Sequence, residues 1–493
     1  MLLSPDQAAT ATGTMTAKDR RDDTPVLVVD LDGTLIRSDT LYECFWLALS
    51  RTWRTLPRVA RWLMGERAIL KQELAQLAKL SPEFLPYNQD VLDYIRDWGE
   101  KGGRAVLVTA ADQSIADGVA EHTKLFDDAV GSDGSTNLKG DAKARLLQDR
   151  FHDVGYVYMG DSSADLPVWE GAKKAVTVNA SASIERQVQD MPVESEILNE
   201  GQDPRAYLTA LRPHQWLKNI LLFAPIIGAQ AFDLATLVSA LVAFVAFSLV
   251  SSSGYVFNDL MDLRADRAHP RKSERPFASG QVPISHGTAM VPLLLFGGLA
   301  MGALVNWQTL SIIAIYFAMT TIYSLLLKSR AIADICTLGV LYTLRIIAGG
   351  LATGLALSVW LLAFSMFFFF ALAAVKRQAE LVDLRRRGIS NARRRGYTVE
   401  DLPIIRQLSL ASGFVSVLVL ALYLDTDGVK DLYSTPRVLG IICLILLYWI
   451  SRISLKAHRG EMHDDPIVYA LRDRISLACI VIIIVSAFGA SVL

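Results

Sequence analysis

Charged residues are concentrated between two long apolar runs, in the stretch NDLMDLRADRAHPRKSERPFASG of residues 258–280. Asn258, Asp262 and Asp266 are four residues apart, so a continuous helix would stack them on one face. Like charges stacked in this way repel, which predicts a cation between them, and Mg²⁺ that chelates a diphosphate satisfies this requirement. The basic residues that follow can bind the outer phosphate oxygens. These are His269, Lys272 and Arg275.

A second acidic group follows the stretch PVLVV near the N-terminus. Val26 to Val29 are β-branched or apolar, which is typical of a buried strand. Asp30 and Asp32 come directly after it, before Gly33. Both acids are therefore expected at the carboxyl edge of a sheet, where open α/β sheets bind ligands.

Three further stretches continue this pattern along the chain. RAVLVTAAD is a predicted strand that ends at Thr109, and NLKGDAKARLL offers Lys139 and Lys143. VGYVYMGDSSADLPVW is a predicted strand that ends near Asp161, with Asp165 four residues later. One such strand end is weak evidence for a site, but four elements in this order form a recognisable set.

In this order, the four stretches resemble the haloacid dehalogenase superfamily of phosphotransferases over residues 24–190. The resemblance implies an α/β, Rossmann-like fold in which Asp30 is a nucleophile that forms an aspartyl-phosphate and Asp32 is a general acid/base. It also implies phosphoryl binding by Thr109 and Lys143, with Lys139 left as an alternative. The implied Mg²⁺ ligands are Asp30, Asp161, Asp165 and the backbone carbonyl of Asp32.

The second acid distinguishes the kinds of chemistry that this superfamily performs. A phosphatase needs Asp32, whereas a dehalogenase would not keep it. Residues 39–100 are helix-like and fit a small cap inserted after the first motif, which would limit substrate access. The alternative is a domain that is regulatory and not catalytic.

The rest of the chain has the composition of a membrane protein. The chain of 493 residues carries 49 basic and 50 acidic residues, and this balance gives no sign of nucleic-acid binding. Residues 1–23 are predicted to be a disordered tail without a signal peptide, and residues 191–210 a linker. Residues 211–493 contain apolar runs of about twenty residues, the length that spans a bilayer. We predict about nine spans in an all-α bundle, at 214–231, 234–257, 286–305, 308–327, 333–353, 358–375, 409–424, 437–454 and 474–492.

The charges between these runs predict an orientation. Lysines and arginines gather in the loops after the even-numbered spans, including Arg385 to Arg387 and Arg393 to Arg395. By the positive-inside rule these loops and the N-terminal domain face the cytoplasm. The expected location is the inner (plasma) membrane of a bacterium, with both active sites cytoplasmic.

The charged stretch that follows the second span resembles a motif of the UbiA superfamily of intramembrane prenyltransferases. Its pattern is N-D-x-x-D-x-x-x-D followed by H-P-x-K-x-x-R-P-x-A-S-G. The stretch LRPHQWLKN, with Lys218, and the stretch YSLLLKS, with Lys328, extend the resemblance. It implies that Asn258, Asp262 and Asp266 hold a second Mg²⁺ with a diphosphate substrate and that the basic residues bind phosphate.

One departure from the family pattern narrows the comparison. Typical members carry a second aspartate-rich motif after the fifth span, where this chain has only Asp334 and Arg345. Lys376 and its neighbours follow the sixth span instead, an arrangement that resembles the decaprenyl-phosphate phosphoribosyltransferase branch. An arginine inside a span is a functional-site candidate by default. Arg345 is predicted either to bind a polyprenyl phosphate or to pair with Asp334.

Together the two resemblances imply a bifunctional enzyme. One half would transfer 5-phosphoribose from phosphoribosyl pyrophosphate to a polyprenyl (decaprenyl) phosphate, and the other would remove the 5-phosphate for cell-envelope synthesis. The alternatives are a prenyltransferase that uses a polyprenyl diphosphate beside an independent phosphatase, or a transferase with a non-catalytic N-terminal domain. The expected partners are these two substrates and membrane lipids, and a homo-oligomer is left open.

Overall fold

The computed structural model describes residues 24–492, apart from 53–66, 134–136, 200, 202, 390–395, 427–428, 430–432, 434 and 463–464. The expected disordered tail and the middle of the expected cap therefore lie outside the described residues, as do Arg393 to Arg395. The chain divides into two compact units, Met1–Ala210 with Asp259–Ala289 and Leu211–Asn258 with Met290–Leu493. Residues 259–289, hereafter the aspartate segment, group with the N-terminal unit and not with the helices that flank them in sequence.

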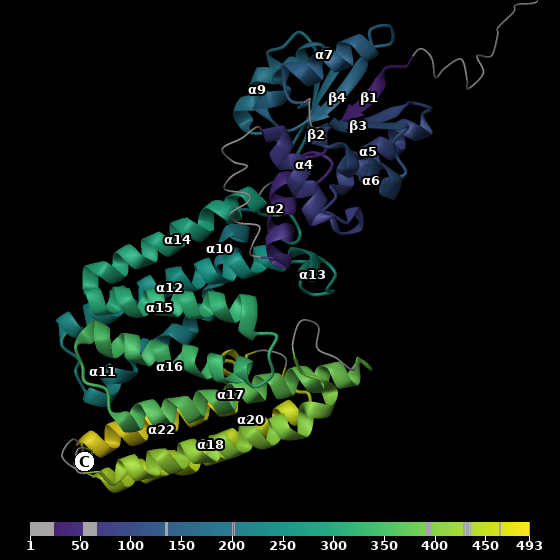
Figure 1. Cartoon of the computed structure of the whole chain (residues 1–493). Coiled ribbons are helices and arrows are strands. Elements are labelled where there is room, and N and C mark those ends of the chain that lie inside the picture. Colours follow the sequence, from purple (N-terminus) through teal and green to yellow (C-terminus); the bar gives the residue numbers. More distant parts are fainter. Residues whose placement is uncertain are drawn as a thin grey trace, which may run out of the picture. The chain divides into compact units, whose positions relative to one another are not determined.

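The first unit is built on a six-stranded parallel sheet in the order β3-β2-β1-β4-β5-β6 (Figure 1). Its central strand β1 pairs with β2 and β4, so the segments after these three strands meet at one edge of the sheet. The strands are β1 (Val26–Val29), β2 (Ala105–Asp112), β3 (Asp128–Ser132), β4 (Tyr156–Gly160), β5 (Lys174–Val178) and β6 (Glu194–Leu198).

Helices cover both faces of this sheet, as the alternation of side chains in β1 requires. Leu27 and Val29 pack on one face with residues of the helices that precede β2 and β3, while Val26 and Val28 pack on the other. The helices are α2 (Thr40–Arg51), α4 (Arg67–Ala78), α5 (Gln89–Glu100), α6 (Gln113–Thr123), α7 (Asp141–Arg150), α8 (Leu166–Glu170) and α9 (Ala182–Gln189). The α/β fold expected for residues 24–190 is confirmed, and α2, α4 and α5 occupy the region predicted to form the cap.

The second unit consists of helices that lie alongside one another in a bundle (Figure 1). The helices of the chain after residue 204 are α10 (Arg205–Leu211), the 3₁₀ stretch η3 (Pro213–Phe223), α11 (Ala224–Ala229), α12 (Leu234–Met261), α13 (Leu263–Arg267), α14 (Ile284–Val305), α15 (Trp307–Ile322), α16 (Ala333–Thr353), α17 (Val359–Arg386), α18 (Leu402–Leu424), α20 (Gly440–His458), α21 (Pro466–Ala470) and α22 (Arg474–Val492). Of these, α13 and nearly all of α10 group with the first unit. Large apolar side chains such as Leu234, Leu304 and Trp307 are exposed on their outer faces, as lipid contact requires.

Seven helices of the described residues are long and apolar enough to cross a membrane, so the predicted count of nine is not confirmed. The predicted first span, 214–231, is not one α-helix but η3 followed by the short α11. Pro213 and Pro225 each lie in the first turn of one of these pieces, because proline fits the first turn of a helix but interrupts its interior. The predicted last span corresponds to α22, whose apolar part is slightly shorter than the others.

Candidate functional site

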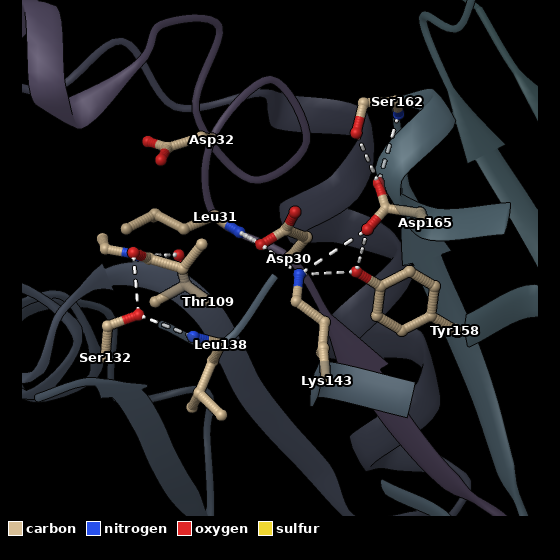
Figure 2. A network of polar contacts seen from close by, with 12 residues as sticks. Asp30, Leu31, Asp32, Thr109, Ser132, Leu138, Lys143, Tyr158, Ser162 and Asp165 are labelled. Carbon is tan, nitrogen blue, oxygen red and sulfur yellow. Dashed lines mark hydrogen bonds and ion pairs between the residues drawn. The ribbon is translucent and has the colours of Figure 1, made fainter. Parts of the chain in front are cut away.

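The first acidic centre lies where β1 ends, as predicted from Asp30. The Asp30 carboxylate accepts a hydrogen bond from the Leu31 N–H at 2.8 Å and lies 3.0 Å from the Lys143 ammonium. Lys143, on α7, is 2% exposed and also lies 3.6 Å from Asp165. Figure 2 shows these side chains converging beside β4. A buried ammonium between two carboxylates is suited to hold phosphoryl oxygens beside a nucleophile.

Lys139 does not share this position. Its side chain is exposed, whereas Lys143 contacts Asp30 directly. Thr109 lies within β2, which continues to Asp112 and does not end at Thr109 as predicted. It is fully buried, and its hydroxyl accepts a hydrogen bond from the Ala111 N–H at 3.0 Å. The structure therefore brings Asp30, Lys143 and Asp165 together, with Lys139 outside the group.

Tyr158 is a member of this network that sequence reasoning missed. Its hydroxyl donates to Asp165 at 2.7 Å and accepts from Lys143 at 2.8 Å. Asp165 also accepts from the Ser162 hydroxyl at 3.0 Å. Tyr158 stands two residues before Gly160 on a strand of five buried residues, and the sequence of such a strand does not show where a tyrosine hydroxyl points.

Asp32 lies apart from the network around Asp30 and Lys143 (Figure 2). Its two carboxylate oxygens accept from the Thr40 backbone N–H at 2.7 Å and from the Thr40 hydroxyl at 3.1 Å. Burial raises the pKa of Asp32 well above its ordinary value, and the charge of Asp39 adds to this. A raised pKa favours the protonated carboxyl group, which is the form that can protonate a leaving group.

Three carboxylates fit the expected metal. Oxygen atoms of Asp30, Asp161 and Asp165 all lie within 4.8 Å of one another, and carboxylate oxygens are the ligands that Mg²⁺ prefers. Burial raises the pKa of Asp161 to about 8, with Asp30 and Asp165 adding to it, and burial raises the pKa of Asp30 to about 6 against the influence of Lys143. Gly33 has a φ of +73°, and a Cβ there would overlap the Asp161 carboxylate. These carboxylates lie close enough to repel one another, and a bound cation would relieve that repulsion.

The aspartate segment differs from the continuous helix expected for its acids. α12 ends at Met261 and α13 begins at Leu263, so Asp262 stands at a break with a φ of −105°. The four-residue spacing therefore does not stack the three side chains along one helix. The break places Asp262 at the N-cap of α13, where aspartate is favoured over continued helix.

Arg275 pairs with acids of its own segment in this structure. Its guanidinium lies 2.6 Å from Asp266 and 3.1 Å from Asp259, and both carboxylates are buried. Burial raises the pKa of Asp266, while Arg275 acts in the opposite direction. His269 is half-buried and its Nδ1 accepts from the Arg271 N–H, Lys272 is exposed, and Asn258 is half-buried. Arg275 thus offsets the charge of Asp266, one of the acids expected to hold a diphosphate-bound cation.

The second unit contains a cationic cluster around an acid that the sequence analysis did not identify. Asp465 lies 2.8 Å from the Lys218 ammonium and 2.9 Å from the Lys376 ammonium, and it accepts from the Tyr342 hydroxyl at 3.3 Å. Although burial alone would raise it, Lys376 and Lys218 hold the pKa of Asp465 well below its ordinary value. The signal available was the stretch DDPIVYALRDR, an acid-rich loop before the last apolar run.

Arg345 is buried beside this cluster, on α16. Its guanidinium donates to the Asn219 side-chain carbonyl at 2.9 Å, the Tyr316 hydroxyl at 2.8 Å and the Leu341 carbonyl at 2.6 Å. The predicted alternative of a pair with Asp334 is wrong, because Asp334 is bound 2.7 Å from Arg377. Arg345 therefore carries a buried charge whose described hydrogen bonds go to neutral oxygens. Lys328, the remaining predicted phosphate ligand, is half-buried at the end of the π-helical turn Tyr323–Leu327.

Two family models match the chain in the regions that carry these centres. The UbiA prenyltransferase family model matches residues 220–463, and the haloacid dehalogenase-like hydrolase model matches residues 27–170. An uncharacterised protein of Sinorhizobium fredii is 40% identical over 458 residues, which cover 91% of this chain and 88% of the relative. A relative of nearly full length therefore aligns across both matched regions.

Relatives with a named activity are also similar to this chain. The decaprenyl-phosphate phosphoribosyltransferase of Mycobacterium tuberculosis is 32% identical over 290 residues, which cover 57% of this chain and 93% of that protein. Among solved structures, a UbiA homologue of Archaeoglobus fulgidus bound to GPP and Mg²⁺ matches at a TM-score of 0.44 and 15% identity. That match covers 58% of this chain and all of the homologue.

Proposed function

Because the chain belongs to the UbiA prenyltransferase family and carries a haloacid dehalogenase-like hydrolase domain, we propose that it is a bifunctional membrane enzyme. Its helical part would transfer 5-phosphoribose from phosphoribosyl pyrophosphate to a polyprenyl phosphate. Its N-terminal domain would then hydrolyse the 5-phosphate to give polyprenyl-phospho-ribose. The observation that carries the proposal is one chain with an intact phosphatase centre and 32% identity to a decaprenyl-phosphate phosphoribosyltransferase.

In the transfer step, an oxygen of the lipid phosphate forms a bond to the anomeric carbon of the sugar. The bond from that carbon to pyrophosphate breaks, and pyrophosphate leaves with its electron pair. Asn258, Asp262 and Asp266 would hold Mg²⁺, which neutralises charge on the departing pyrophosphate when it is bound. Arg275 would then exchange its carboxylate partners for phosphate oxygens, with His269 and Lys272 beside it in sequence.

The cationic cluster of the second unit suits the phosphate of the lipid acceptor. Lys218 and Lys376 share one carboxylate, so the group carries an excess of positive charge before Arg345 is added. Buried cations in an apolar environment attract an anion strongly, because little water competes with it. We assign lipid-phosphate binding to Arg345, Lys218 and Lys376, with Lys328 as a further contact.

In the hydrolysis step, a carboxylate oxygen of Asp30 attacks the phosphorus of the 5-phosphate. The sugar 5-oxygen leaves as an alcohol after it accepts the proton of Asp32, and an aspartyl-phosphate remains. Asp32 then accepts a proton from water as that water attacks the phosphorus and releases Asp30. Lys143 and Thr109 would orient the phosphoryl oxygens, and Mg²⁺ bound by Asp30, Asp161 and Asp165 would neutralise them when present.

The protein is an integral membrane protein, as its apolar helices and its family indicate. The proposal places it in the inner membrane of a bacterium with the N-terminal domain in the cytoplasm, because the arginine- and lysine-rich loops follow the positive-inside rule. Both substrates of the transfer step would then be met on the cytoplasmic side. A labelling reagent that cannot cross the membrane should modify a cysteine placed in the exposed loop at Lys272 only after the cytoplasmic side is opened.

The proposal is tested by measuring which diphosphate donor the protein uses. Purified protein with Mg²⁺, polyprenyl phosphate and labelled phosphoribosyl pyrophosphate should move label into the lipid phase, and Asp262→Asn should abolish this. Asp30→Asn should stop at the phosphorylated lipid, while Asp153→Asn, at an exposed acid of the same domain, should change neither step. Transfer from a prenyl diphosphate in place of phosphoribosyl pyrophosphate would overturn the proposal. An unchanged final product in Asp30→Asn would remove the phosphatase step from it.

A further inference from the structure

The aspartate segment is bound to the cap region of the phosphatase by a buried ion pair within the first compact unit. The Arg267 guanidinium, on α13, contacts both carboxylate oxygens of Glu43, on α2, at 2.6 and 3.0 Å. The side chains of Glu43 and Arg267 are 3% and 8% exposed. Arg267 also donates to the Ala278 carbonyl at 2.9 Å, so this one side chain joins both ends of the turn that follows α13.

Further contacts surround this pair. The Trp46 indole, one turn later on α2, donates to the Thr288 hydroxyl at 2.8 Å, and Arg264 lies over the Phe84 ring at 5.3 Å. Gly280 has a φ of +80°, and a Cβ there would lie 2.6 Å from that of Arg37. The aspartate segment thus contacts the phosphatase at several points along its length.

The same turn of α2 also holds the acid of the phosphatase. Thr40 binds both oxygens of Asp32, and Glu43, three residues later, binds Arg267 and accepts from the Ser38 hydroxyl at 2.6 Å. On the other side, Arg267 directly follows Asp266, which is one of the proposed transferase ligands. A shift of this turn would therefore move Asp32 and the aspartate segment together.

We propose that Glu43 and Arg267 are positioning residues for both reactions: the ion pair couples the geometry of the Asp32 loop to that of the aspartate segment. Glu43 would thus support transfer although it belongs to the phosphatase, and Arg267 would support hydrolysis although it belongs to the membrane family's motif. The coupling rests on the proposed function only for the identity of the transferred group.

The test is whether each substitution acts on the reaction of the other domain. Glu43→Gln should raise KM for the diphosphate donor about 10-fold or more in the transfer assay, and Arg267→Gln should lower hydrolysis of a generic aryl phosphate about 10-fold. The charge-exchanged variant Glu43→Arg with Arg267→Glu should recover part of both activities, which an unfolded or aggregated protein would not do. Asp93→Asn, which breaks the exposed pair with Arg96 on α5, is the matched control and should change neither.

Amide hydrogen exchange of the full-length protein gives a readout that does not depend on any substrate. Arg267→Gln should accelerate exchange in the first turn of α2, and Glu43→Gln should accelerate it in residues 263–280. If wild-type protein transfers nothing from phosphoribosyl pyrophosphate but these exchange effects are present, the proposed function fails and the coupling stands. If transfer is normal in Glu43→Gln, or each substitution changes exchange and activity only in its own domain, the coupling is refuted.

Discussion

Replacement of Lys143 by methionine should disturb the acidic centre around Asp30 more strongly than any other single substitution. The ammonium lies 3.0 Å from Asp30 and 3.6 Å from Asp165, with a hydrogen bond to Tyr158 at 2.8 Å, and the side chain is buried. Methionine has a similar length and no charge. The substitution therefore leaves two buried carboxylates without their cation, a change that costs about 3–5 kcal/mol in other proteins.

That cost has two measurable consequences. Because about 1.4 kcal/mol corresponds to a tenfold change in an equilibrium, local opening of β1 should become roughly 100- to 3000-fold more frequent. Amide exchange of Val26–Val29 in metal-free, full-length protein reports this opening directly. Mg²⁺ should restore part of the protection, because it supplies a cation to the same carboxylates, but turnover of an aryl phosphate should stay at least 100-fold low.

Lys139→Met is the matched control for this experiment. Lys139 is exposed and lies four residues earlier on the same segment, so its loss should change stability by less than about 0.5 kcal/mol and leave turnover intact. Equal effects of the two substitutions, or loss of turnover in Lys139→Met alone, would refute the assignment of the buried lysine. Rapid exchange in Lys143→Met that Mg²⁺ does not slow would show that the damage is general and not electrostatic.

Further outcomes are expected, each with its own measurement. In metal-free protein, the folded domain holds protons on Asp30 and Asp161 that the unfolded chain releases above about pH 4, so stability should fall as the pH rises toward 8. Mg²⁺ must displace these protons, so calorimetry should show proton release and an affinity that rises by up to tenfold per pH unit for each proton displaced. Gly33→Ala, at a φ of +73° and against Asp161, should weaken Mg²⁺ binding at least tenfold in the same calorimetry. Asp465→Asn leaves two lysines without their shared acid, so it should destabilise the second unit by about 3–5 kcal/mol in thermal unfolding and abolish lipid labelling. Asp32→Asn should slow turnover of a phosphate ester about 10²- to 10⁴-fold in steady-state kinetics, because the asparagine amide cannot act as a general acid or base toward the leaving oxygen and the water.

The haloacid dehalogenase-like domain could be predicted from the sequence because its motifs are local. Each acid follows a short buried strand, and a parallel sheet brings the ends of β1, β2 and β4 to one edge without further information. The choice between Lys139 and Lys143 required the fold, since both precede or begin α7 and only the packing of that helix decides which one faces Asp30. Tyr158 was missed for a similar reason, because a tyrosine in a core strand gives no sign of where its hydroxyl points.

The membrane half was less predictable, because its contacts join residues far apart in the chain. Asp465 meets Lys218 across 247 positions, and no local pattern identifies such a partner. One of the two predicted alternatives for Arg345, a pair with Asp334, is wrong because Asp334 pairs with Arg377 on the neighbouring helix. The helix break at Asp262 was missed because spacing alone assumes that a helix continues.

A buried ion pair is a costly way to attach the aspartate segment to α2, which bears on why Glu43 and Arg267 are charged at all. Apolar side chains of similar volume often stabilise a contact as well as or better than buried charges do, because desolvation consumes the electrostatic gain. Apolar surfaces, however, tolerate sliding, whereas the two N–H groups of a guanidinium meet a carboxylate in one orientation. The pair therefore adds little to stability, but it fixes the position of the aspartate segment relative to α2. A fixed relative position is needed here, because Thr40 holds Asp32 on one side of a helical turn and Arg267 adjoins Asp266 on the other.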